Sequence, residues 1–237
     1  MAIRLDKYIA TVLGLSRTDA RKVISSGRVT VNGTTFRSGD MKVFEGDRVE
    51  VDGRYAEYEE FIYLMMNKPA GVVCSTKDKA RTVVDLVKEE YPRRELFPAG
   101  RLDIDTTGFV LLTDDGAFAH EILSPSKHVV KRYRVTVDGP ITRQIADRFR
   151  RGMTLSDGTV LKQADLIAAE GDTSGIVEIS QGIFHQIKRM FAEFSLNVVS
   201  LHRLSIGGLE LDPSLKSGEY RKLTMEEVRS IRGEDAR

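Results

Sequence analysis

Apolar residues near the N-terminus recur at the spacing that is typical of amphipathic helices. A first helix is predicted over about residues 5–13, with apolar positions at Leu5, Tyr8, Ile9, Val12 and Leu13. The segment SRTDARKVISSG predicts a second helix, because Ser16 can cap its N-terminus and Gly27 can end it. Two short helices are therefore expected at the start of the chain.

Alternating apolar and polar residues follow these helices. The segment RVTVNGTTF predicts two strands joined by an Asn-Gly turn, and DRVEVDG predicts a further strand. The helices and the small sheet together make an α+β domain of residues 1–53. The polar and acidic segment of residues 54–60 predicts a linker.

Strands and helices are mixed in the rest of the chain, residues 61–237. FIYLMMNKPAGVVCST contains two strand-like runs, and the apolar run FVLLT predicts a buried strand. Further strands are expected over residues 129–137 and 176–180, and helices over residues 82–90, 141–150 and 184–195. No regular βα repeat occurs, and no Gly-rich phosphate loop follows a strand. We therefore expect a larger α+β domain with a mixed, largely antiparallel sheet flanked by helices.

The composition is that of a folded globular protein, since 41% of the 237 residues are hydrophobic and 30% are charged. The sequence has neither a run of about 18 apolar residues nor the features of a signal peptide. We expect a cytoplasmic protein without membrane association. Cys74 is the single cysteine, and no zinc-like spacing surrounds it. We expect a buried structural thiol there and no structural zinc.

The net charge of +1 conceals a local division of charge. Residues 1–37 carry seven cations against two anions, Asp6 and Asp19. The cations are Arg4, Lys7, Arg17, Arg21, Lys22, Arg28 and Arg37. Arg17 and Arg21 are four residues apart, so they share one face of the second helix. Such a surface is typical of a phosphate-backbone binder, but charge alone equally fits a solvated surface.

Four carboxylates flank the apolar run in GRLDIDTTGFVLLTDDG, namely Asp103, Asp105, Asp114 and Asp115. Their spacing approaches that of an EF-hand calcium loop, but a strand fills the middle of the segment and no helix precedes it. A second interpretation is structural, because Asp residues followed by Gly are typical of tight turns. We prefer this interpretation for Asp105, Asp114 and Asp115. A third is that one carboxylate is a catalytic nucleophile or base.

A catalytic carboxylate needs a nearby cation that keeps it ionised and fixes its direction. The predicted helix in IFHQIKRMFAEF can supply one, because it buries its aromatic residues and turns Lys188 and Arg189 to another face. Basic residues on helices are usually solvated, so spacing alone leaves the pairing open.

The segment RLDKYIATVLGLSRTDARKVISSGRVTVNG, followed by VFEGDRVEV, resembles the S4 RNA-binding domain. The resemblance extends from Ile3 to about Val51 and implies RNA binding, without any implication for catalysis. It favours phosphate binding over a merely solvated surface. The expected RNA-binding residues are Arg4, Lys7, Arg17, Arg21, Lys22 and Arg28.

The motifs NKPAGVVCST, AGRLDIDTTGFVLLTDDG, KRYRV and QGIFHQIKRMF together resemble the RsuA family of pseudouridine synthases, which convert uridine to pseudouridine in ribosomal RNA. The resemblance covers essentially the whole chain, including LHRLSIGG and SGEYRKLTMEE. It implies that Asp103 is the essential aspartate, that Tyr133 stacks on the target base, and that Lys188 pairs with the aspartate. Arg101 and Leu201 are expected to line the substrate pocket.

The implied reaction breaks the N1–C1′ bond of uridine and forms a C5–C1′ bond without a redox change. No cofactor and no metal are therefore expected. Whether Asp103 attacks C1′ or removes a sugar proton stays open. His185 is a candidate to line the RNA cleft, but we do not expect it to act as a general base.

The expected substrate is one uridine of small-subunit (16S) ribosomal RNA, within a partly assembled small subunit, and the expected enzyme is a monomer. One alternative is a synthase that acts on large-subunit (23S) RNA, but the HQIKRMF wording favours the small-subunit branch. Another is a non-catalytic RNA-binding assembly factor, which the combination of Asp103, Tyr133 and Lys188 disfavours.

Overall fold

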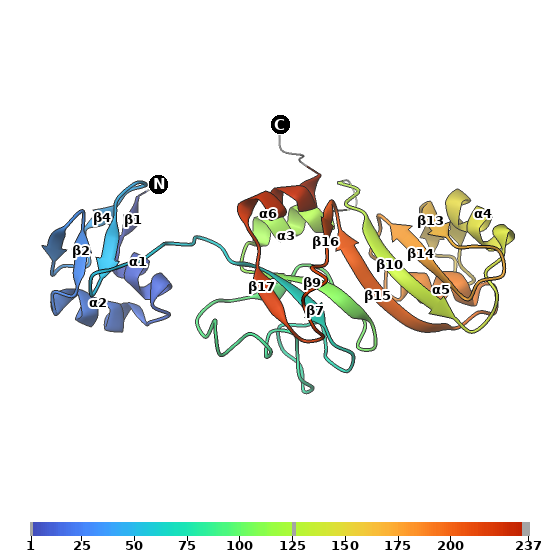
Figure 1. Ribbon diagram of the computed structural model, residues 1–237, viewed down its shortest axis with the longest axis horizontal. Coiled ribbons are helices and arrows are strands. Elements are labelled where there is room, and N and C mark those ends of the chain that lie inside the picture. Colours follow the sequence, from blue (N-terminus) through green and yellow to red (C-terminus); the bar gives the residue numbers. More distant parts are fainter. Residues whose placement is uncertain (1, 125–126, 234–237) are drawn as a thin grey trace. The chain divides into compact units, whose positions relative to one another are not determined.

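The computed structural model describes residues 2–124 and 127–233 (Figure 1). The chain divides into two compact units. One consists of Met1–Phe61 and Lys88–Glu95, and the other of Ile62–Val87 and Leu96–Arg237. Within the described ranges, no helix is long and apolar enough to cross a membrane.

Two helices and small sheets form the N-terminal unit. α1 (Leu5–Val12) and α2 (Arg17–Ser25) confirm the two predicted helices, and the side chain of Ser16 caps α2 as expected. The larger sheet has the strand order β3-β2-β5-β6, and β1 pairs separately with β4. These strands are β1 (Ile3–Arg4), β2 (Val29–Val31), β3 (Thr34–Phe36), β4 (Lys42–Val43), β5 (Val49–Val51) and β6 (Arg54–Tyr55). The predicted hairpin between β2 and β3 is confirmed.

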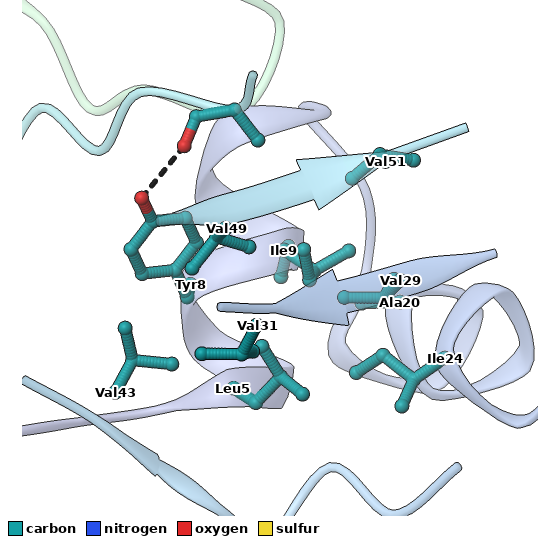
Figure 2. Close-up of a cluster of buried hydrophobic side chains, with 12 residues drawn as sticks. Leu5, Tyr8, Ile9, Ala20, Ile24, Val29, Val31, Val43, Val49 and Val51 are labelled. Atoms are coloured by element: carbon teal, nitrogen blue, oxygen red, sulfur yellow. Dashed lines mark hydrogen bonds between the residues drawn. The ribbon is translucent and has the colours of Figure 1, made fainter. Parts of the chain in front are cut away.

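An apolar core lies between the helices and the sheet of this unit (Figure 2). Its buried residues are Leu5, Tyr8, Ile9, Ala10, Ala20, Ile24, Val29, Val31, Val43, Val49, Val51 and Ala56. The Tyr8 hydroxyl donates a hydrogen bond of 2.6 Å to the carbonyl of Ala56. Residues 54–56, which the sequence placed in a linker, thus belong to the sheet and core of the N-terminal unit. Their polar neighbours conceal this in the sequence, because one short edge strand gives little apolar signal.

A mixed sheet forms the centre of the larger unit. Its described strands run in the order β13-β14-β10-β15-β9-β7-β17, with β16 beside β15 and β8 beside β9. These strands are β7 (Tyr63–Lys68), β8 (Phe97–Pro98), β9 (Thr107–Thr113), β10 (Lys131–Val137), β13 (Ala164–Ile167), β14 (Ser174–Ile179), β15 (Val198–Ile206), β16 (Leu209–Glu210) and β17 (Tyr220–Lys222). Among these described strands, only β9 and β15 pair in parallel. The predicted α+β class with a largely antiparallel sheet is confirmed.

Helices cover this sheet in two places. The remaining elements are α3 (Gly116–Leu123), α4 (Arg143–Arg151), α5 (Gln186–Ala192), α6 (Met225–Arg232) and a hairpin of β11 (Met153–Thr154) and β12 (Val160–Leu161). α3 and α6 lie side by side over one face, and Phe118 and Ile231 share a core with Phe109 of β9 (Figure 1). α4 and α5 meet through Phe149 and Phe191, whose ring centroids are 5.0 Å apart.

The helix predicted over residues 82–90 is wrong, because successive turns replace it. Thr82 and Asp85 accept hydrogen bonds from each other's backbone N–H groups. The N–H of Val87 bonds to the carbonyl of Val84, one residue short of an α-helical bond. The β-branched residues and the Thr-Asp pair both favour turns over a helix here.

Two further predictions need correction. The second strand-like run of FIYLMMNKPAGVVCST is not a strand, and its only described ladder contact is an isolated bridge between Val73 and Thr82. The nine-residue strand β15 was not predicted, because polar residues interrupt its apolar positions and give a weak alternation. The partners of β15 are distant in sequence, whereas Thr82 lies only nine residues after Val73.

β9 is the predicted buried strand, and all of residues 109–113 are inaccessible to solvent. It lies between β7 and β15 in the sheet. Gly108 in this strand has a φ of +98°, and a Cβ atom there would lie 2.4 Å from the carbonyl oxygen of Arg203 on β15. Glycine is therefore required for β9 and β15 to approach each other.

Candidate active site

Asp103 lies in the turn that leads into β9. The buried ammonium of Lys68 holds this turn in place. Its Nζ donates hydrogen bonds of 3.0, 3.2 and 2.8 Å to the carbonyls of Pro69, Ile104 and Thr106. Burial lowers the pKa of Lys68, although nearby acidic groups act in the opposite direction. The position of Asp103 thus depends on a buried cation from a neighbouring strand.

Two side chains from the HQIK segment contact the Asp103 carboxylate on its two oxygens. His185 Nε2 lies 3.3 Å from Oδ1, and Lys188 Nζ lies 3.2 Å from Oδ2. The Asp103 side chain is 24% exposed, so a substrate can reach it. The structure therefore brings together the aspartate and the lysine that the sequence paired.

Lys188 also contacts a second carboxylate. Its Nζ lies 2.7 and 2.9 Å from the two carboxylate oxygens of Asp105, closer than it lies to Asp103. Burial acts to lower the pKa of Lys188, but the hydrogen bonds and charges of both aspartates outweigh it and raise the pKa. The hydrogen bond from Lys188 in turn lowers the pKa of Asp105. Asp105, which the sequence assigned to the turn alone, is thus part of an ion-pair network.

His185 stands at the start of α5 in a left-handed backbone conformation, with φ 53° and ψ 28°. Its ring stacks on Phe184, with ring centroids 3.7 Å apart and an angle of 19° between the planes. Non-glycine residues adopt this conformation uncommonly, and such residues cluster at functional sites. The sequence placed His185 near RNA but did not reveal its contact with Asp103. The available signal was its spacing, three residues before Lys188.

A row of paired residues crosses the four central strands at this level. Lys68 on β7 pairs with Gly108 on β9, which pairs in turn with Arg203 on β15. Arg203 pairs with Tyr133 on β10. Directly paired residues project to the same face of a sheet, so Lys68, Arg203 and Tyr133 share one face. Phe109 projects to the opposite face, which α3 and α6 cover.

Arg203 connects the strands of this row and is a residue that the sequence did not single out. Its Nε donates a hydrogen bond of 2.6 Å to the carbonyl of Phe109, and Nη1 lies 3.4 Å from the Tyr133 hydroxyl. Nη2 is buried and has no hydrogen-bond partner among the described residues. Tyr133 itself is 7% exposed. The guanidinium therefore holds the hydroxyl end of the tyrosine beside β15.

The two residues expected at the substrate pocket lie in different surroundings. Leu201 on β15 is buried and pairs with Val135 of β10, so it lies on the same face of the sheet as Tyr133. Arg101 is exposed and precedes Asp103 by two residues. Leu201 is thus fixed by strand register, whereas Arg101 is exposed to solvent.

The other two carboxylates of the segment lie at the far end of β9. Asp114 Oδ1 accepts a hydrogen bond of 2.7 Å from the Ile62 N–H. Asp115 caps α3 by accepting a hydrogen bond of 2.9 Å from the Phe118 N–H. Tyr63 donates a hydrogen bond of 2.6 Å to Asp115, and burial together with this bond raises the pKa of Tyr63. These contacts agree with the structural role predicted for Asp114 and Asp115.

No cluster of three or more His, Cys, Asp and Glu side chains suited to a metal ion occurs in residues 2–124 and 127–233. A cavity of about 480 Å³ is lined by His128, Arg151, Lys162, Glu178 and neighbouring residues, and none of the predicted catalytic residues borders it. Cys74 is buried as expected, and burial raises its pKa.

The predicted RNA-binding cations all lie in the N-terminal unit, and most are held by carboxylates. Arg4, Arg17 and Arg21 pair with Asp6, Lys22 pairs with Asp19, and Arg28 pairs with Asp52. Lys7 is exposed. The three arginines around Asp6 form the densest group of positive charge among these pairs.

Family comparison gives the class of protein that this fold and site define. Residues 62–193, more than half of the chain, match the family described as RNA pseudouridylate synthase. Residues 3–49 match the S4 domain. The two units thus combine an S4 domain with a catalytic domain that modifies RNA.

Alignments with individual relatives cover nearly the whole chain. "Ribosomal small subunit pseudouridine synthase A" of Escherichia coli is 43% identical over 230 residues, which cover 97% of this chain and all of that protein. An uncharacterised RNA pseudouridine synthase of Bacillus subtilis is 42% identical over 95% of this chain and 97% of its own length. A crystal structure of a pseudouridylate synthase matches with a TM-score of 0.69 at 40% identity, over 97% of this chain and 99% of the other. The chain belongs to the RNA pseudouridine synthase family, and the resemblance seen in its motifs is confirmed.

Proposed function

We propose that this protein isomerises one uridine of small-subunit (16S) ribosomal RNA to pseudouridine, with Asp103 as the essential carboxylate. The family match supports the reaction class. The small-subunit target rests on 43% identity, over almost the entire chain, to a protein named for that activity. The S4 domain supports RNA binding by the N-terminal unit.

The observation that carries the proposal is the fixed and accessible carboxylate of Asp103. His185 contacts one oxygen at 3.3 Å and Lys188 the other at 3.2 Å. Lys68 fixes the turn by hydrogen bonds to the carbonyls of Ile104 and Thr106. A carboxylate that is contacted on both oxygens keeps one direction, which reduces the reorganisation needed for reaction. Such an arrangement suits chemistry at a ribose carbon.

The reaction breaks the N1–C1′ bond and forms a C5–C1′ bond within one nucleotide, so no electrons are gained or lost overall. Asp103 either attacks C1′ or removes a sugar proton while the detached uracil turns over. Both routes need Asp103 in its ionised form at the start. The raised pKa of Lys188 keeps its ammonium charged beside the aspartate.

The target base must leave the RNA stack before it can reach Asp103, at a cost of roughly a few kcal/mol. Tyr133 stacks on the extruded base, Leu201 packs beside it, and Arg101 contacts the substrate near the aspartate. Tyr133 is 7% exposed in the RNA-free chain, so the base has to displace neighbouring side chains to reach the ring. Phosphate contacts of the N-terminal unit offset part of this cost.

The cellular setting follows from the substrate. The proposed substrate particle is a partly assembled small subunit, in which the RNA is not yet fully covered. A monomer is the proposed state, because Lys188 contacts Asp103, and Tyr133 and Leu201 lie on paired strands, within a single copy of the chain. The protein acts in the cytoplasm, where ribosomal RNA is assembled, and needs no small-molecule cofactor.

The test is carbodiimide labelling followed by primer extension, which stops at pseudouridine. Ribosomal RNA of both subunits, free and in partly assembled particles, is treated with wild-type protein or with Asp103→Asn. Asn keeps the shape of the side chain but cannot act as a nucleophile or base. We expect one stop in 16S RNA with the wild-type protein and none with Asp103→Asn, a loss of at least about a thousandfold in rate.

The other outcomes separate the alternatives. A single Asp103-dependent stop in 23S RNA would reassign the substrate to the large subunit and leave the chemistry unchanged. Tight RNA binding without a stop on any substrate would replace the enzyme with a non-catalytic assembly factor. Equal stops with wild type and Asp103→Asn would remove Asp103 from its proposed role.

A further inference from the structure

One carboxylate in the N-terminal unit is surrounded by three guanidinium groups. The side chain of Asp6, in the first turn of α1, is completely buried. Arg17 Nη2 lies 2.6 Å from its Oδ1, and Arg21 Nη2 lies 2.9 Å from its Oδ2. Arg4 also contacts both oxygens, with Nη2 2.9 Å from Oδ2 and Nε 3.2 Å from Oδ1. Residues from β1 and α2 thus converge on one buried charge in α1.

The backbone around Asp6 leaves the carboxylate little freedom. The Asp6 N–H donates a hydrogen bond of 3.0 Å to the carbonyl of Gly39, and the N–H of Leu5 bonds to Met41 O at 2.8 Å. A Cβ atom at Gly39 would lie 2.7 Å from Cβ of Asp6 and 3.5 Å from Cγ of Arg21. The loop that contains Gly39 therefore packs directly against the aspartate and one of its arginines.

The charges of this group are not balanced. Three cations surround one buried anion, and the only other carboxylate that contacts them is Asp40, which pairs with Arg4 among the described residues. The hydrogen bond from Arg4, followed by those from Arg17 and Arg21, overcomes burial and holds the pKa of Asp6 well below its ordinary range. Asp6 therefore stays ionised at neutral pH, and the group keeps a net positive charge.

The three arginines remain accessible. Their side chains are 42%, 53% and 57% exposed for Arg4, Arg17 and Arg21, whereas Asp6 is buried beneath them. A guanidinium has five N–H donors, so each arginine keeps donors that do not point at Asp6. Guanidinium groups fixed in this way match the oxygens of a phosphate in a bidentate manner.

We propose that Asp6 is a positioning residue that holds Arg4, Arg17 and Arg21 as one preformed site for a phosphate of the RNA backbone. The inference rests on the proposed function, because it assumes that the N-terminal unit binds ribosomal RNA. The expected effect of Asp6 on RNA affinity is opposite to the effect of its charge alone. An acidic residue beside a basic surface ordinarily repels RNA, whereas here the buried carboxylate increases affinity by removing the ordering cost of three flexible side chains.

The test compares two substitutions that remove the same charge. Asp6→Asn removes the carboxylate under the three arginines, and Asp52→Asn removes an exposed carboxylate that pairs with Arg28. Asp52 has a φ of +50°, which asparagine tolerates, so this control keeps its backbone. Binding of the full chain to transcribed 16S RNA is measured at several salt concentrations.

We expect Asp6→Asn to bind about tenfold more weakly than wild type and Asp52→Asn to bind equally well or slightly more tightly. Affinity of Asp6→Asn equal to or above wild type would overturn the proposal, because loss of the carboxylate would then have acted only through net charge.

A double-mutant cycle separates positioning from a general effect on folding. In the Arg17→Ala/Arg21→Ala background, Asp6→Asn should change RNA affinity by less than about twofold, since most of the side chains that it positions are gone. A loss of about tenfold in this background as well would show that Asp6 acts through the fold, and would overturn the proposal. The thermal unfolding of each variant is recorded so that affinities refer to folded protein.

If Asp6→Asn does not fold, Arg17→Lys/Arg21→Lys supplies the measurement with Asp6 intact. Lysine keeps the charge but lacks the planar fork, so we expect weaker binding with a similar salt dependence. Unchanged affinity would overturn the proposal. Failure of the proposed function is distinguishable, because RNA binding is measured apart from pseudouridine formation. If Asp6→Asn weakens RNA binding but the wild-type protein modifies no RNA, the inference stays intact. If the wild-type protein modifies RNA and Asp6→Asn does not weaken binding, only the inference is refuted.

Discussion

His185 Nε2 lies 3.3 Å from Oδ1 of Asp103, the carboxylate oxygen that does not face Lys188. The aspartate is therefore held from two sides, by an imidazole and by an ammonium. Both groups come from one short segment, and His185 has a left-handed backbone conformation at the start of α5. We therefore expect His185 to help set the direction of the carboxylate.

Replacing His185 by asparagine tests this contact. Asparagine adopts left-handed backbone conformations, so His185→Asn removes the ring while the start of α5 is retained. We expect the single-turnover rate of pseudouridine formation to fall by about threefold to tenfold, because Asp103 loses one of its two fixed contacts. The matched control is His120→Asn, at an exposed position of α3. Equal rates for both variants and wild type would show that the imidazole does not direct Asp103.

Asp105 competes with Asp103 for Lys188. Because Nζ lies closer to Asp105, Asp105→Asn should leave the ammonium to Asp103 alone. We expect a change in rate within about tenfold, far smaller than the loss in Asp103→Asn.

The pKa of Asp105 is lowered by Lys188, so the contribution of Asp105 to the free energy of unfolding is present above its ordinary pKa of 3.8 and is lost as the pH falls below that value. The rates of pseudouridine formation by Asp105→Asn and Asp103→Asn are measured under the same conditions. A loss of rate in Asp105→Asn as large as that in Asp103→Asn would contradict this division of roles.

Lys68 acts through the backbone of the turn that carries Asp103. Lys68→Met removes the donor to three carbonyls and leaves them buried without their partner. We expect the free energy of unfolding to fall by about 2 to 4 kcal/mol, with a slower reaction because the turn is less well fixed. Denaturant unfolding at neutral pH measures the first effect. A variant as stable as wild type would show that methionine and solvent replace these hydrogen bonds without loss.

Replacing Lys131, unlike replacing Lys68, is expected to stabilise the protein. Lys131 is 9% exposed and lies two residues before Tyr133 on β10, and burial, with a smaller effect of Arg203, lowers its pKa from 10.5 to about 8. The folded protein therefore holds a charged lysine at a cost below pH 8, and the cost disappears as the pH rises from 8 to 10.5. Lys131→Met should raise the free energy of unfolding by about 1 to 3 kcal/mol at pH 7.

The gain from Lys131→Met should shrink when the measurement is repeated at about pH 10, because the wild-type lysine is then largely neutral in the folded state. Denaturant unfolding at the two pH values provides the comparison. Lys216→Met, at an exposed position, is the matched control and should show no such pH dependence. A gain that is larger at the higher pH would mean that desolvation does not govern this lysine.

Much of the fold could be predicted from local signals. The two N-terminal helices and the hairpin carry caps, periodicity and an Asn-Gly turn within a few residues of each other. The error at β15 arises because its conformation depends on distant partners, whereas the error at residues 82–90 arises because local hydrogen bonds between Thr82 and Asp85 favour turns. β15 is held by β10 and by the glycine contact with β9, neither of which leaves a signal in its own sequence.

The sequence by itself predicted the reaction class through its resemblance to a known family, and the same motifs proposed roles for Asp103, Tyr133 and Lys188. Only the tertiary structure decided which other side chains lie beside these three residues and hold them in place. Lys68, His185 and Arg203 reach the site through strand pairing and one left-handed residue, and Asp6 gathers arginines from two elements. The physical reason is that a contact depends on where folded segments meet, whereas a motif records only residues that are neighbours along the chain.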